Sequence, residues 1–227
     1  MNKNTFRACG VLEDLSFSPY GNIELVLKMI QYIKGKEKTR LIFMTLQEGG
    51  YQGKFRPGDW VEVTGHIESK SRKNKKNGQV STTQVLVAEQ VLKAKTWIES
   101  EFGIKGGCRA AHEAEFVGCL SGTILATKQS KEDGRTKKEP HMIMTVKSGE
   151  TDYVMINNFV KGITVKEGDE IVLVYDVNGI QKTERNITRR FISLTVKDIA
   201  VTTKAPKKEK KAPVKAELLD SFFEDEE

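Results

Sequence analysis

Positively charged and aromatic side chains alternate along the first quarter of the sequence. Ammonium and guanidinium groups pair with phosphates, and flat rings stack on unpaired bases, at about 1–3 kcal/mol per base. Single-stranded nucleic acid needs both kinds of side chain. Phe43, like Trp60, also fits a buried core, whereas the tyrosines have polar neighbours and are better stacking candidates. The candidates of these two types are Tyr20, Lys28, Tyr32, Arg40, Phe43, Tyr51, Lys54 and Arg56.

A second group of cations lies in residues 69–78, which carry five positive charges and no negative charge. This composition fits a solvated hairpin tip, and it fits a clamp for phosphates equally well. Both interpretations stay open at this point. The five cations are Lys70, Arg72, Lys73, Lys75 and Lys76.

The charge of the 227-residue chain is unevenly distributed around a net value of +6. Residues 1–94 hold +6, residues 95–203 hold +1, residues 204–215 hold +5 and residues 216–227 hold −6. A basic body favours a polyanionic partner, because neutralised phosphates release condensed counterions. We expect the nearly neutral second half to bind more weakly, or to serve mainly as a platform.

Sequence motifs for catalysis are missing. The chain has no phosphate-binding glycine loop with its lysine, no HExxH, no Gly-x-Ser-x-Gly and no CxxC pair. We therefore expect no enzymatic activity and no cofactor. A zinc site built from Cys108, His112 and Cys119 would lack a fourth ligand and matches no standard spacing.

The expected compartment is the cytoplasm. Cys9, Cys108 and Cys119 are odd in number and lack metal-type spacing, which favours reduced structural thiols. No apolar run approaches the roughly 20 residues of a membrane-spanning helix. No apolar segment follows the amino terminus as it does in a signal peptide. We expect no association with a membrane.

Strand patterns dominate the first ninety residues. Period-two or continuous apolar runs occupy residues 6–12, 23–33, 41–46, 60–67 and 80–92, which predicts five strands. A short helix is expected within residues 94–102, in or near a connector.

The second half of the sequence repeats the first. Residues 8–12 resemble residues 120–124, residues 56–63 resemble 166–173, and residues 88–91 resemble 196–199. The offsets are 112, 110 and 108 residues, so the order is kept while the loop lengths change slightly. This pattern indicates two copies of one small fold.

Five short strands per copy fit a small closed barrel, which removes exposed sheet edges. An immunoglobulin-like sandwich needs about seven strands per hundred residues. Gly10 and Gly122 are placed to kink each first strand, and Gly58-Asp59 and Gly168-Asp169 form turns before the fourth strands. This arrangement resembles tandem oligonucleotide/oligosaccharide-binding (OB) folds. The expected fold class is all-β, with a first OB-fold over residues 1–95, a connector over 96–114, a second OB-fold over 115–203 and a tail over 204–227.

The resemblance implies a binding groove on strands two and three and on the loops that join strands one to two and four to five. Lys28 and Tyr32 would come from strand two, and Arg40 and Phe43 from strand three. Lys54 and Arg56 would come from the loop that follows. The cations of residues 69–78 would lie in the loop between strands four and five.

The carboxy terminus combines a basic linker with an acidic, aromatic tip. Residues 204–215 are rich in lysine, alanine and proline and are expected to be disordered. The tip is similar to the tails of bacterial and bacteriophage single-stranded DNA-binding proteins, except that it ends in two glutamates rather than a phenylalanine. The resemblance therefore implies competition for the basic groove and recruitment of partners, but not through the terminal carboxylate. Its candidate residues are Leu218, Leu219, Phe222, Phe223, Glu224, Asp225, Glu226 and Glu227.

These observations predict a protein of bacteriophage or mobile-element type that coats single-stranded DNA, with little sequence preference, during replication, recombination or repair. Its expected protein partners, reached through the tail, are replication or recombination proteins. Two alternatives stay open: an adaptor whose barrels bind protein at the replisome, and an RNA-binding OB-fold factor.

Overall fold

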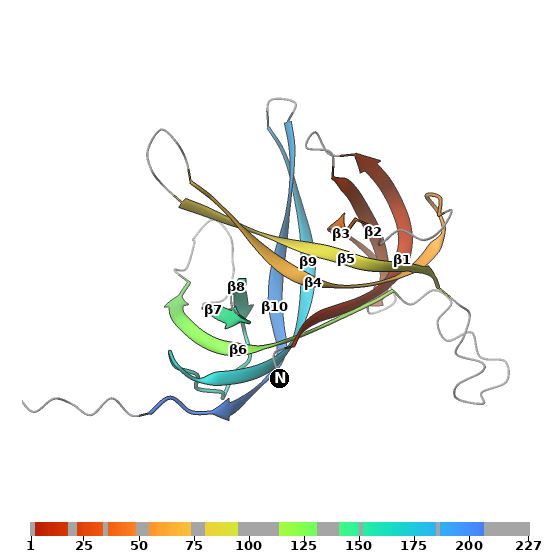
Figure 1. The fold of residues 1–227 in the computed structure, drawn as a ribbon. Coiled ribbons are helices and arrows are strands. Elements are labelled where there is room, and N and C mark those ends of the chain that lie inside the picture. Colours follow the sequence, from red (N-terminus) through yellow and green to blue (C-terminus); the bar gives the residue numbers. More distant parts are fainter. Residues whose placement is uncertain are drawn as a thin grey trace, which may run out of the picture.

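The computed structural model describes residues 3–17, 22–33, 36–48, 55–73, 80–94, 114–130, 141–149, 152–184 and 187–206. Every element in this part of the chain is a strand, and the fold is all-β (Figure 1). The predicted helix, apart from Ala94, and the acidic tip lie outside the described residues. The strands are β1 (Asn4–Phe17), β2 (Ile23–Ile33), β3 (Lys36–Leu46), β4 (Trp60–Lys73), β5 (Val80–Lys93), β6 (Glu115–Gln129), β7 (Met142–Ser148), β8 (Asp152–Asn158), β9 (Glu170–Glu184) and β10 (Ile187–Thr203).

Each set of five strands closes on itself. In the first barrel β1 pairs with β2 and β4, β2 pairs with β3, β4 pairs with β5, and a parallel β3–β5 pairing completes the ring. In the second barrel β6, β7, β8, β10 and β9 follow the same order, and the parallel pairing is between β8 and β10. This ring order is that of OB-fold-like barrels, as the sequence predicts.

The turns before β4 and β9 have the same local geometry, as the internal repeat predicts. Asp59 accepts a hydrogen bond from the backbone N–H of Arg56 at 2.9 Å, and Asp169 accepts one from Lys166 at 2.8 Å. Gly58 and Gly168 have φ angles of 96° and 88°, a region that glycine enters without steric cost. The equivalent residues are 110 apart, as in the sequence match.

The glycines of the first strands have a different role from the kink that the sequence suggests. A Cβ on Gly10 would lie 2.8 Å from the carbonyl oxygen of Lys28, and one on Gly122 would lie 2.1 Å from that of Lys147. Glycine is therefore required because a neighbouring strand approaches closely. The bend itself is accompanied by register shifts at Leu12/Asp14 and at Ile124/Ala126, which are also 112 residues apart.

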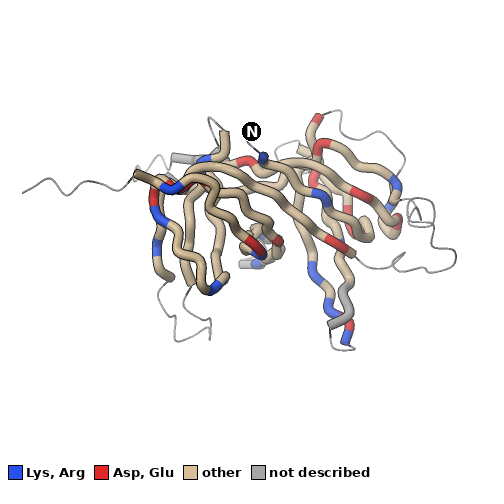
Figure 2. Tube along the Cα trace, turned by 90° about the horizontal axis from the view of Figure 1, so that it is seen from below, with Lys and Arg blue, Asp and Glu red and all other residues tan. Residues whose placement is uncertain are grey.

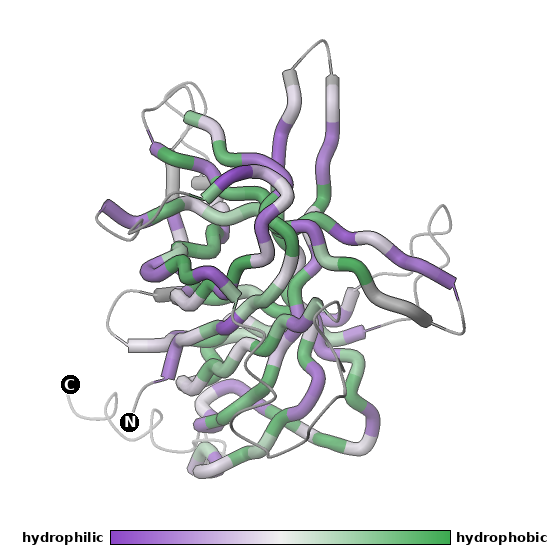
Figure 3. The backbone as a smooth tube through the Cα atoms, turned by 90° about the vertical axis from the view of Figure 1, so that its right-hand side faces the viewer, coloured by the Kyte–Doolittle hydropathy of each residue, from purple (hydrophilic) through white to green (hydrophobic). Residues whose placement is uncertain are grey.

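The two barrels are joined through their first strands, because β1 pairs with β6 in antiparallel orientation. Buried apolar residues alternate with outward-facing residues along the strands, so hydrophobic and hydrophilic segments alternate along the tube in Figure 3. Within the described residues no helix is long and apolar enough to cross a membrane.

Strand β4 extends further than the apolar pattern predicts. The expected fourth strand covers residues 60–67, whereas β4 continues to Lys73. Residues 68–73 are polar or charged and therefore show no apolar periodicity, although their backbone stays in register with β5 as far as the Lys73–Val80 pair. The hairpins β4–β5 and β9–β10 each project from the body of their own barrel (Figure 1).

Candidate nucleic-acid interface

The structure describes the side chains of only some predicted binding residues. Lys28, Arg40, Phe43, Arg56 and Lys70 are described with their side chains. Those placed on strands without a described side chain are Tyr32, Arg72 and Lys73, and those outside the described residues are Tyr20, Tyr51, Lys54, Lys75, Lys76 and the tail from Leu218 to Glu227. The site is therefore built from the first group and from the residues that surround it.

Arg40 lies at the contact between the barrels. One of its terminal nitrogens, Nη1, is 2.8 Å from a carboxylate oxygen of Asp176 on β9 and donates a hydrogen bond to the carbonyl oxygen of Val177 at 3.0 Å. Lys197 on β10 pairs with the second carboxylate oxygen of Asp176 at 3.3 Å. The side chain of Arg40 is only 17% exposed, so this predicted phosphate ligand is engaged within the protein.

Phe43 lies at the same contact. The guanidinium of Arg190, on β10, lies 5.4 Å from the centre of the Phe43 ring, within the range of a cation–π interaction. Arg190 also pairs with Glu24 at 3.0 Å and with Asp14 at 3.7 Å, both in the first barrel. The β9–β10 hairpin thus packs against the strand-three side of the first barrel, where the resemblance places the groove.

Lys28, Arg56 and Lys70 are not joined to this cluster by any contact in the described part of the chain. Lys28 lies 3.8 Å from Glu13. The side chain of Arg56 is exposed in the turn before β4. Lys70 is 54% exposed on β4 and lies 3.8 Å from Glu68.

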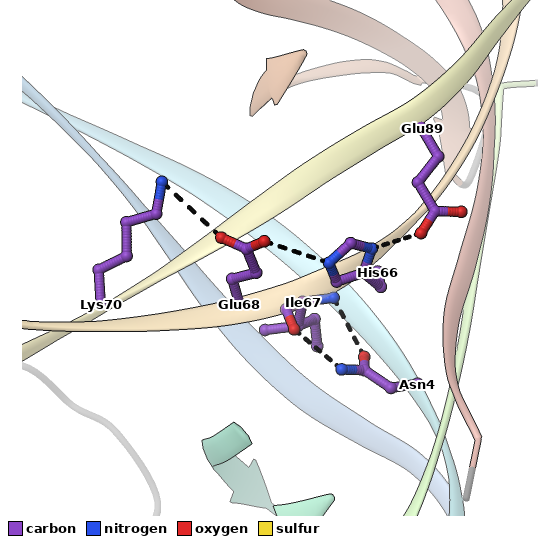
Figure 4. A network of polar contacts seen from close by, with 6 residues as sticks. All are labelled: Asn4, His66, Ile67, Glu68, Lys70 and Glu89. Atoms are coloured by element: carbon purple, nitrogen blue, oxygen red, sulfur yellow. Dashed lines mark hydrogen bonds and ion pairs between the residues drawn. The ribbon is translucent and has the colours of Figure 1, made fainter. Parts of the chain in front are cut away.

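A polar network extends from Lys70 along the surface of β4 and β5 (Figure 4). The ring of His66 lies between Glu89, at 2.6 Å, and Glu68, at 3.4 Å. Asn4 exchanges two hydrogen bonds with the backbone of Ile67 and ties β1 to β4. These carboxylates reduce the positive potential at the base of the β4–β5 hairpin.

The corresponding face of the second barrel presents exposed rings. Tyr153 and Met155 point outward from β8 and are 44% and 43% exposed, and Phe159, just after β8, is 43% exposed. Val154 and Ile156 point inward and are fully buried. Sequence reasoning missed this face, although the alternation over residues 153–159 is the pattern of a half-buried strand.

Phe159 is held in place by an ordered partner. The rings of His141 and Phe159 stack with centres 4.2 Å apart and planes 23° from parallel. The side-chain nitrogen of Asn157 donates to the carbonyl of Leu194 at 2.9 Å, so its oxygen faces His141 Nε2 at 3.1 Å and requires an N–H there. His141 Nδ1 then accepts from the Ser130 hydroxyl at 3.0 Å. Phe159 is thus a preorganised stacking surface.

Cations lie close to this aromatic face. Lys147 is opposite Tyr153 in the β7–β8 register, and Lys128 is opposite Ile143 in the β6–β7 register. The hydroxyl of Ser69, one residue before Lys70, donates a hydrogen bond to the carbonyl oxygen of Tyr153. The basic hairpin of the first barrel therefore runs beside the aromatic face of the second barrel. Figure 2 shows how the lysine and arginine residues are distributed over the described part of the chain.

Thiols and metal-type side chains offer no further chemistry in the described part of the chain. Cys9 and Cys119 are free cysteines. Burial raises the pKa of the Cys9 thiol, which lowers its reactivity. Among the described residues no three His, Cys, Asp or Glu side chains gather as a metal ion requires. Cys108 and His112 lie outside the described residues.

Comparison with known proteins gives a structural likeness without a sequence match. No protein-family model and no curated protein matches the chain. The crystal structure of the wild-type single-stranded DNA binding protein from Thermus aquaticus is similar, with a TM-score of 0.56 and 13% identity over 92% of this chain and 97% of that chain. A deletion mutant of that protein gives a TM-score of 0.53 and 12% identity over 92% and 98% of the two chains. At these identities the likeness shows the shared fold.

Proposed function

We propose that this chain is a non-catalytic protein that binds single-stranded DNA. The observation that carries the proposal is the Ser69–Tyr153 hydrogen bond, which holds the cationic β4–β5 hairpin beside the exposed rings of the second barrel. Backbone phosphates need the cations and unpaired bases need the rings, so this composite surface offers both. The likeness to single-stranded DNA binding proteins supports the same function.

The proposed path of the strand differs from the groove that the resemblance implies on the first barrel. Arg40 and Phe43 are engaged with the β9–β10 hairpin, whereas Tyr153, Met155 and Phe159 are exposed. We therefore assign base stacking to the second barrel. The hairpin cations are assigned to the phosphates, with Lys128 and Lys147 beside the rings.

A titration of the tryptophan fluorescence of the full chain with oligo-dT tests this function. We expect saturable binding of oligo-dT and much weaker binding of a duplex of equal length, because paired bases cannot stack on the rings. The logarithm of the affinity should fall linearly with the logarithm of the salt concentration, with a slope of about −0.7 per phosphate neutralised. Weak binding of oligo-dT that disappears with added salt would instead favour the adaptor. Preference for an RNA oligomer of the same sequence would favour the RNA-binding factor.

The acidic tip is proposed to compete with DNA and to recruit partners in replication or recombination. Its six carboxylates follow a segment of net charge +5, so the tip has the charge to occupy the DNA surface. Deleting residues 216–227 should raise the affinity for oligo-dT, most strongly at low salt, because screening weakens competition between exposed charges. Equal affinities of the two chains at low salt would contradict the competition. We further propose that the protein is cytoplasmic, which the reduced structural thiols favour, and of bacteriophage or mobile-element type, which the resemblance of the tip favours.

A further inference from the structure

A pocket between the barrels has a lining that differs from the rest of the surface. It lies where β10 crosses β2, β3 and β5, and it is open to solvent. The buried side chains of Leu25 and Met44 form part of the lining. The residues with polar or aromatic groups that line it are Glu24, Phe43, Thr45, Gln84, Arg190 and Phe191.

Two polar groups of this pocket have unused hydrogen-bonding capacity. The side-chain nitrogen of Gln84 is buried and finds no partner among the described residues. Glu24 uses one carboxylate oxygen, Oε2, for Arg190 at 3.0 Å, and its other oxygen makes no contact in the described part of the chain. A buried donor without an acceptor is costly, so a ligand that supplies one is favoured.

The repeat shows that this lining is not imposed by the fold. The strand registers make Ile143 equivalent to Glu24 and Met155 equivalent to Phe43, and they make Thr82 and Thr83 equivalent to Arg190 and Phe191. The second copy therefore has neither the charges nor the rings at these positions. The polar and aromatic lining is specific to one of the two junctions.

We propose that this pocket, on a chain that binds single-stranded DNA as argued above, takes one unpaired cytosine base. The amino group of cytosine donates to the free oxygen of Glu24, since a carboxylate is the natural acceptor for that group. The amide nitrogen of Gln84 donates to the ring nitrogen or carbonyl oxygen of the same base. Phe191, which is 38% exposed, supplies an apolar wall for the ring.

The ratio of affinities for oligo-dC and oligo-dT tests the proposal, measured by fluorescence anisotropy slightly above neutral pH. We expect the full chain to prefer oligo-dC by about tenfold, the magnitude of one good base contact. Glu24→Gln should bring the ratio of the two affinities close to one, because the new side-chain amide can donate a hydrogen bond to the thymine carbonyl. Asp14→Asn is the matched control: it weakens the same Arg190 contact but does not line the pocket, so its ratio should stay at the wild-type value.

Gln84→Leu tests whether the Gln84 amide binds the base or only water. If cytosine uses the amide, this variant loses the preference for oligo-dC while its circular dichroism spectrum stays that of the wild type. A wild-type ratio near one, or a ratio unchanged in both Glu24→Gln and Gln84→Leu, overturns the pocket while DNA binding stands. Failure of the full chain to bind either oligomer overturns the pocket and the proposed function together.

Discussion

Phe6 of β1 lies directly opposite Gly118 of β6 in the strand pair that joins the barrels. These two residues are also 112 apart, the offset at which the first strands repeat. The same offset exchanges Asn4–Leu120 with Ala8–Phe116, and Thr5–Cys119 with Arg7–Val117. A pseudo-twofold axis therefore passes between Phe6 and Gly118, and the barrels meet as two halves of an isologous pair do.

The axis explains the reciprocal contacts of the two hairpins. Ser69 of β4 donates to the carbonyl of Tyr153 on β8. At the equivalent positions, a Cβ on Gly179 of β9 would lie 2.0 Å from the carbonyl oxygen of Leu41 on β3. Each hairpin thus reaches the third strand of the opposite barrel, and the absence of a side chain at Gly179 allows the closer approach.

The first prediction concerns the pairing of a ring with a glycine in each barrel. Phe6 pairs with Gly65 in the first barrel and Tyr175 pairs with Gly118 in the second, so ring and glycine exchange strands between the copies. Gly118→Ala should lower the free energy of unfolding by about 1–3 kcal/mol, because its Cβ would lie 2.1 Å from the Tyr175 ring. Urea unfolding measures this change.

The control for this prediction is Val117→Ala, at a neighbouring exposed position, which should change stability by less than about 0.5 kcal/mol. The double variant Gly118→Phe with Tyr175→Gly restores the arrangement of the first barrel. It should be more stable than Gly118→Phe alone. The single variants Gly118→Phe and Tyr175→Gly are measured beside it. If the double variant loses as much free energy of unfolding as the two single variants together, the exchange of ring and glycine is contradicted.

The second prediction concerns the Arg40–Asp176 ion pair. Both side chains are mostly buried, so Asp176→Asn should cost about 2 kcal/mol by leaving the guanidinium without a carboxylate. Arg40→Ala should cost less, because Asp176 keeps Lys197 at 3.3 Å. Urea unfolding of both variants ranks the two costs.

The matched control is Arg7→Ala, which removes the more exposed Arg7–Glu62 pair and should cost less than about 1 kcal/mol. A loss of oligo-dT affinity in Arg40→Ala without any loss of stability would return Arg40 to the DNA surface and contradict its assignment to the barrel contact.

The sequence predicts most of the strand framework because alternation and turn residues are local signals. Residues 23–33 are predicted as a strand, and β2 spans the same residues. The repeat offsets also locate the equivalent turns at Gly58 and Gly168. These features need only neighbouring residues, or the comparison of one copy with the other.

The site is harder to predict because it depends on how the barrels meet. Arg40 and Asp176 are 136 positions apart, and no periodicity joins them. Charge counts favour the first half as the binding half, whereas the exposed rings of Tyr153 and Phe159 belong to the nearly neutral second half. Only the packing of a hairpin against the opposite barrel decides which face stays open.

The third prediction concerns the acid sensitivity that Asp169 contributes. Hydrogen bonds from the backbone N–H groups of Ala205 and Lys166, both 2.8 Å long, lower the pKa of Asp169 below its ordinary value. A folded-state pKa below the unfolded one stabilises the fold above the ordinary aspartate pKa of about 3.9, and that contribution is lost as the pH falls further. In Asp169→Asn the urea midpoint should be lower at neutral pH and should fall less on acidification. Parallel pH curves for the two proteins would contradict the role of this carboxylate.

The last prediction tests the aromatic face directly. Phe159→Ala and Tyr153→Ala should each weaken oligo-dT binding by roughly 5- to 150-fold, which corresponds to the 1–3 kcal/mol of one stacked base. His141→Ala should reduce the affinity less, because the Phe159 ring remains and loses only the His141 ring that stacks on it at 4.2 Å. Phe17→Ala is the control, since Phe17 is 78% exposed at the end of β1 in the first barrel and lies outside the proposed path. Wild-type affinity in the Tyr153 and Phe159 variants, combined with a loss in Phe17→Ala, would move the stacking surface to the first barrel.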